Sequence, residues 1–78
     1  MKFFLLVYDR RLGHLVDSPR EFGEEDRALA LAERFRREII EQGRPDIEVV
    51  LLGAESRADL ERTHSRYFRT LEQIASSS

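Results

Sequence analysis

The sequence predicts a small α+β domain with the element order strand, strand, helix, strand, helix. Two short apolar runs, residues 3–8 and 47–52, have the length and composition of strands. Two longer segments, residues 24–42 and 56–74, repeat apolar residues at the three- and four-residue spacing of helices. A chain of 78 residues is the size of one domain, which we assign to residues 1–75, with a disordered tail at 76–78.

The first two strands are expected to form a hairpin. The first spans residues 2–9 and is followed by Gly13, which can take the positive φ of a tight turn. The second, residues 14–17, is short, mixed in polarity and close to Pro19, as is typical of an edge strand. The pattern Ser18-Pro19-Arg20-Glu21 resembles a capping box, so we expect a turn there that leads into the first helix.

The two helices have clear predicted ends. The first should run from Glu24 to Gln42, with Gly43 just beyond it. Its predicted core-facing stripe consists of Ala28, Leu31, Ala32, Phe35 and Ile39. After the third strand, residues 46–52, Ser56 is the predicted N-cap of a helix that continues to Ile74. The stripe of this second helix consists of Leu60, His64, Tyr67, Phe68, Leu71 and Ile74 or Ala75.

The connections predict the arrangement of the sheet. A hairpin makes the first two strands neighbours, and a helix returns the chain before the third, which gives a three-stranded mixed sheet of order 2-1-3. The two helices can lie on the same face or on opposite faces. We expect both on one face, in a two-layer domain, because the stripe of the second helix is narrow and includes His64 and Tyr67, which require polar partners.

Composition argues against several classes of function. Thirteen basic and fifteen acidic residues nearly cancel, whereas nucleic-acid binders usually have a basic surplus. The absence of cysteine argues against disulfides and thiolate metal clusters and favours a reducing, cytoplasmic setting. The apolar runs are too short to span a membrane. We therefore expect no cofactor, no metal, no membrane and no nucleic acid.

The predicted sheet has more apolar surface than two helices on one face can cover. The other face would expose Phe4, Leu6, Tyr8, Val50 and Leu52. A patch of several hundred Å² is about as large as, or larger than, what a monomer usually exposes, and a second copy related by a two-fold axis is the commonest cover. The sequence thus predicts a non-enzymatic interaction or assembly module, a homodimer through this face, which would also suit a subunit of a larger protein assembly.

Two alternative functions remain open. A ligand binder or enzyme would use a polar cluster of His64, Arg66 and Tyr67, since histidine titrates near neutral pH, or the hairpin-end pair Asp9 and His14. Nucleic-acid binding would use the arginines of the second helix, Arg57, Arg62, Arg66 and Arg69. No nucleophile or carboxylate stands at a spacing that pairs with the histidine locally, so we assign no catalytic residue. No motif is specific enough to name a family.

Overall fold

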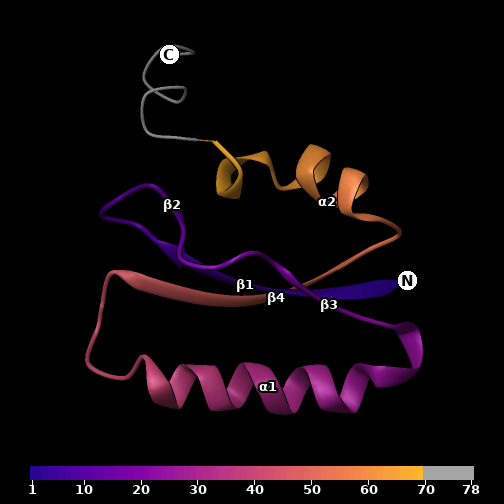
Figure 1. Cartoon of the computed structure of the whole chain (residues 1–78), viewed down its shortest axis with the longest axis horizontal. Coiled ribbons are helices and arrows are strands. Elements are labelled where there is room, and N and C mark those ends of the chain that lie inside the picture. Colours follow the sequence, from indigo (N-terminus) through magenta and orange to yellow (C-terminus); the bar gives the residue numbers. More distant parts are fainter. Residues whose placement is uncertain (70–78) are drawn as a thin grey trace.

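The computed structural model describes residues 1–69 and confirms the predicted α+β class. Three long elements dominate it: a central strand, an edge strand and one helix (Figure 1). The elements are β1 (Lys2–Asp9), β2 (His14–Leu15), β3 (Arg20–Phe22), the 3-10 turn η1 (Glu24–Asp26), α1 (Arg27–Ile40), β4 (Ile47–Ala54), α2 (Arg57–Thr63) and the 3-10 turn η2 (Ser65–Tyr67).

β1 is the centre of the sheet. β4 pairs with it along its whole length, from Lys2 opposite Ala54 to Asp9 opposite Ile47. The short strands β2 and β3 pair with separate parts of β1, and because β4 occupies one edge of β1 throughout, they share the other edge. The hairpin strand and the last strand therefore flank the first, as predicted. The expectation of a mixed sheet is wrong, because all three hydrogen-bonded pairs are antiparallel.

Part of the segment predicted as a turn before the first helix is a strand. The predicted capping box at residues 18–21 gives way to β3, and neither η1 nor α1 has a side-chain cap. Phe22 explains the difference, because its buried ring packs against Leu5 of β1 and Ala30 of α1. Burial of this aromatic ring in the sheet outweighs the weak local preference for a cap.

The predicted stop after the first helix and the predicted N-cap of the second are confirmed, whereas α1 begins at Arg27 and not at Glu24. Gly43 follows α1 with a φ of 89°, in the left-handed region that favours glycine. Ser56 caps α2, because its Oγ accepts a hydrogen bond from the Asp59 backbone nitrogen at 3.2 Å. The expectation of one long second helix is wrong, since α2 ends at Thr63 and His64 leaves helical geometry. The predicted continuation to Ile74, with Leu71, and the predicted tail at 76–78 lie outside the described residues.

The two helices lie on opposite faces of the sheet (Figure 1). α1 covers the face that carries Leu5, whereas α2 and η2 cover the face that carries Leu6 and Tyr8. The predicted placement of both helices on one face is therefore wrong. Tyr67 shows why: its ring is buried against the sheet while its hydroxyl bonds Arg66, so the polar members of the α2 stripe do not prevent burial.

Candidate functional site

The predicted interface lies inside the molecule. Phe4, Leu6 and Tyr8 are buried, and they form one cluster with Leu60 of α2 and Tyr67 of η2. The other two predicted interface residues are partly buried and pack against this cluster: Val50 and Leu52. The sheet face that carries these five residues is covered by the chain itself, so it does not provide the open surface on which the predicted dimer depended.

The predicted polar cluster forms in part. Arg66 Nη2 donates hydrogen bonds to Glu48 Oε2 at 2.6 Å and to the Tyr67 hydroxyl at 2.7 Å, and its guanidinium lies 4.3 Å from the centre of the Tyr67 ring. Tyr67 also meets Tyr8 edge to face, with ring centres 5.2 Å apart. His64 takes the C-cap position of α2 instead, where its backbone N–H donates to Leu60. Through Tyr8 and Glu48 these contacts hold η2 against β1 and β4.

Tyr67 is expected to make the free energy of unfolding depend on pH in the alkaline range. Burial raises its pKa and the Glu48 carboxylate adds to this, while Arg66 opposes it. The stabilisation is therefore complete below the unfolded pKa of about 10 and is lost as the pH rises through the higher folded pKa. Tyr67→Phe keeps the ring and should lose this dependence. Urea unfolding between about pH 8 and pH 11 measures it, and equal slopes above pH 10 in both proteins would contradict this assignment.

The side chains of the hairpin-end residues Asp9 and His14 bond to the backbone of the hairpin itself. Asp9 Oδ1 accepts hydrogen bonds from the backbone nitrogens of Arg11 and Leu12, at 2.9 and 3.0 Å. His14 stands opposite Asp9 in the β1–β2 register, and its Nδ1 lies 3.0 Å from the Leu15 carbonyl oxygen. Within residues 1–69, no group of three or more histidine, aspartate or glutamate side chains could hold a metal ion. The pair therefore stabilises the hairpin, in which Gly13 has the expected positive φ of 73°.

Three of the four arginines named for a nucleic-acid face are engaged by carboxylates. Arg57 Nε lies 3.5 Å from Glu61 Oε2, and Arg62 Nη2 lies 3.4 Å from Asp59 Oδ1. Arg66 is held by Glu48, as described above. Each pairing weakens the positive field that a nucleic-acid backbone would need, so the geometry gives no support for a basic binding face here.

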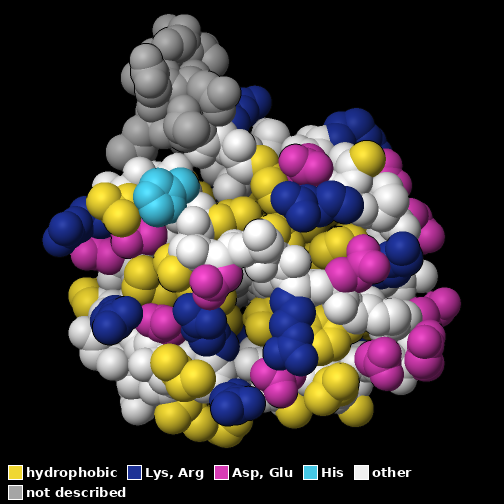
Figure 2. Space-filling model, viewed as in Figure 1, with side chains coloured by type: hydrophobic (Ala, Val, Ile, Leu, Met, Phe, Trp, Pro, Cys, Tyr) yellow, Lys and Arg dark blue, Asp and Glu magenta, His cyan; other side chains and the backbone are white. Residues whose placement is uncertain are grey.

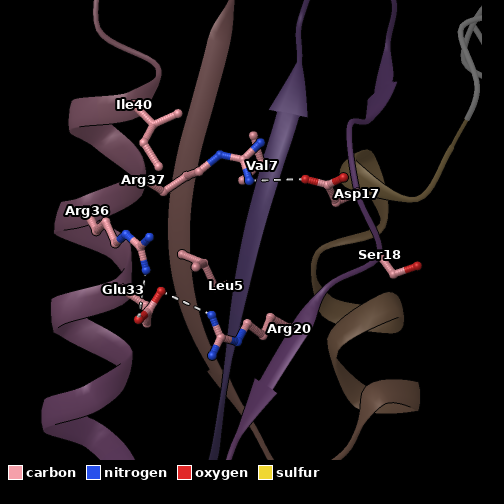
Figure 3. A pocket seen from close by; sticks show the side chains of 9 residues that line it. All are labelled: Leu5, Val7, Asp17, Ser18, Arg20, Glu33, Arg36, Arg37 and Ile40. Atoms are coloured by element: carbon pink, nitrogen blue, oxygen red, sulfur yellow. Dashed lines mark hydrogen bonds and ion pairs between the residues drawn. The ribbon is translucent and has the colours of Figure 1, made fainter.

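A pocket of about 270 Å³ lies between α1 and the β3 side of the sheet (Figure 3). Two ion pairs cross it: Arg20 Nη1 to Glu33 Oε2 at 3.0 Å, and Arg37 Nη1 to Asp17 Oδ2 at 3.1 Å. Beneath these charges lie two side chains of β1, Leu5 and Val7. The guanidinium groups are paired, and no nucleophile and base face each other among the lining residues. The pocket is therefore a structural seam that holds α1 to the sheet.

The sequence did not reveal this seam. Glu33, Arg37 and Glu41 recur every four residues. A core-facing apolar stripe would leave all three on the solvated back of the helix, where charges at this spacing commonly pair with each other. In the structure they face the sheet, and Glu41 is buried beside Arg37. Their position on one stripe was a usable signal, but the sequence predicts Asp17 as the end of the second strand and Arg20 as part of a turn, so neither was expected beside the helix.

The apolar stripe of α1 faces solvent. Leu31, Phe35 and Ile39, which we call the outer stripe, are 45, 66 and 53% exposed. Figure 2 shows apolar side chains along the margin of the molecule where α1 lies. The predicted core-facing role of this stripe is wrong, because Ala30 and the charged seam occupy the sheet-facing side. Alanine lets the helix approach the sheet closely, and the seam fixes its rotation.

No known protein family, no curated protein and no solved structure matches this chain. In the part of the chain that the structure describes, no helix is both long enough and apolar enough to cross a bilayer. The outer stripe of α1 is the surface whose chemistry departs most from that of an ordinary solvated helix. It is therefore the candidate functional site.

Proposed function

We propose that this protein is a non-enzymatic interaction module that forms a homodimer through the outer stripe of α1. One observation carries the proposal: three large apolar side chains on one helix face are roughly half exposed or more. Complete burial of such a side chain contributes about 1.5–3 kcal/mol. A partner that covers the stripe would gain a large part of this from each residue.

The outer stripe suits a second copy of the same chain. Leu31, Phe35 and Ile39 are spaced four residues apart, so the pattern is nearly the same in both directions, and such rows pack into the grooves of a neighbouring helix. An antiparallel copy would therefore place apolar against apolar about a two-fold axis. On one flank Arg34 Nε pairs with Glu38 Oε1 at 2.9 Å. Because each flank meets the same flank of the partner, Arg34 of one copy would lie near Glu38 of the other.

The cellular setting belongs to the same proposal. A dimer of this kind would serve as a subunit of a larger protein assembly, and a chain without cysteine suits the reducing cytoplasm. Ligand binding is not proposed, because the side chains it required are held by internal contacts: Arg66, Tyr67 and Asp9.

Phe35→Glu is expected to abolish the dimer. It places one charge from each copy at the centre of an apolar contact, so the dissociation constant should rise at least about 100-fold. The monomer should keep its fold, because Phe35 contributes little to the core at 66% exposure. Sedimentation equilibrium from about 5 to 500 µM measures the mass, and circular dichroism confirms the fold.

Leu12→Glu is the matched control. Leu12 is also an exposed apolar residue, but it lies in the turn between β1 and β2, away from α1, so its replacement should leave the dimer intact. A wild-type chain that is monomeric up to about 500 µM, which corresponds to less than about 5 kcal/mol of association energy, would reject the homodimer. A Phe35→Glu dimer as strong as the wild type would reject the outer stripe as its surface.

A further inference from the structure

We infer that the dimer also pairs its two β4 strands edge to edge, antiparallel, so that the sheets of the two copies become one. This inference rests on the proposed self-association and names a second surface for it. The edge of β4 and the flank of α1 that carries Leu31 would then lie beside a single two-fold axis.

β4 offers a free edge with a defined set of backbone groups. Among residues 1–69 it pairs with β1 alone. The Val7 carbonyl accepts from the Val16 nitrogen on the β2 side, whereas the Arg10 nitrogen donates to Asp46 on the β4 side. Backbone groups of a strand alternate in direction, so even-numbered residues of β1 face β4 and odd-numbered ones face away. Through the register, the outward groups of β4 belong to Val49, Leu51 and Gly53.

This edge lacks the devices that usually prevent strand pairing. Edge strands are commonly protected by proline, lysine or a bulge, or are kept very short. β4 has eight residues, contains neither proline nor lysine and pairs with β1 without interruption. Its one charged residue, Glu48, is bound by Arg66. In an antiparallel pair centred on Val50, Glu48 would stand opposite Leu52 of the second copy, so no like charges meet.

The position of α1 places the flank that carries Leu31 beside the same axis. Ala30 packs in one cluster with Leu51, and Arg37 shares a pocket with Val7, the partner of Val49. An axis through Val50 therefore passes α1 between residues 30 and 37, the segment that holds Leu31 and Phe35.

The flanks of α1 have the orientation that this axis requires. Glu33 and Ile40 line the pocket on the β3 side, and Glu33 bonds Arg20 of β3 (Figure 3). At 100° per residue, Leu31 and Glu38 fall on the opposite flank. That flank lies on the side of the β4 edge, where it would meet its equivalent in the second copy.

The exposed area of the outer stripe is too small to form a stable dimer interface by itself. At about 150–200 Å² for a large apolar side chain, its three residues expose roughly 300 Å² per copy, or roughly 600 Å² in a dimer. A stable interface buries about 1,200–2,000 Å² in total. Helix contact alone falls short of this, and pairing along an eight-residue strand supplies further area together with backbone hydrogen bonds.

Residue-resolved hydrogen exchange tests the strand pairing. At a concentration about tenfold below the dissociation constant that sedimentation gives, the amides of Val49, Leu51 and Gly53 should exchange quickly, because they face water. At about 500 µM they should slow at least about tenfold, whereas Val50 and Leu52, already bonded to β1, should be protected at both concentrations. Electron-transfer fragmentation after quenching assigns the exchange to single residues.

The outcomes separate the two proposals. A dimer by mass whose Val49, Leu51 and Gly53 amides stay fast would overturn strand pairing and leave the α1 contact standing. A chain with no dimer at any concentration would overturn both. As a second measurement, N-methylation of the Leu51 amide in a synthetic chain keeps the side chain and the β1 ladder, and it should weaken the dimer at least about tenfold. An unchanged dissociation constant would also overturn strand pairing.

Discussion

Leu6→Ala is expected to lower the free energy of unfolding by about 3–5 kcal/mol. Leu6 is 0% exposed and lies in the middle of β1, in the cluster that α2 closes with Leu60. Its truncation removes buried methyl groups and leaves a cavity between two elements that the sheet and α2 hold in place. Small domains have about 5–15 kcal/mol of stability in total, so the loss would be a large fraction. Urea unfolding followed by circular dichroism measures it.

Leu12→Ala is the control for this change. The same chemical truncation at a residue 48% exposed in the β1–β2 turn should alter the free energy of unfolding by no more than about 0.5 kcal/mol. Equal effects at the two positions would mean that Leu6 is not in the core. The predicted open sheet face, with Leu6 at a dimer interface, would then return as the better description.

The strands were predictable because their composition reflects burial on both faces. The apolar runs of β1 and β4 lack alternation, and each face of β1 is indeed buried, Leu5 beneath α1 and Leu6 beneath α2. The side taken by α2 was not predictable in the same way. It depends on Tyr67, whose hydroxyl is satisfied by Arg66, which is anchored in turn by Glu48 on a distant strand. No local pattern encodes that partnership.

The rotation of α1 about its own axis is the second feature that the periodicity of the sequence does not predict. The helix carries an apolar stripe centred on Phe35 and a charged stripe centred on Arg37, both with four-residue spacing. Periodicity identifies a helix but does not decide which stripe faces the sheet when both are regular. In the structure the charged stripe faces the sheet, where Arg37 pairs with Asp17 and Glu33 pairs with Arg20, and both partners come from the segment before α1. The candidate surface of this protein, the outer stripe, follows directly from that rotation.

Leu60→Asp is expected to have an effect at least as large as Leu6→Ala, by a different route. Leu60 is the fully buried contact of α2 with the sheet. An aspartate there loses about 1.5–3 kcal/mol of apolar burial and adds the several kcal/mol needed to desolvate an unpaired charge. The cheaper response is for α2 to detach, which would expose Phe4 and Tyr8. We expect a lower urea midpoint together with strong binding of the dye ANS.

Ala58→Asp separates this effect from a simple change of charge. Ala58 is exposed in the first turn of the same helix, where a carboxylate is favoured by the helix dipole, so stability and dye binding should stay close to the wild type. If Leu60→Asp behaved like Ala58→Asp, α2 would not be the cover of this sheet face. Phe4, Leu6 and Tyr8 would then need another one, and a second copy would have two apolar surfaces to choose from instead of the outer stripe alone.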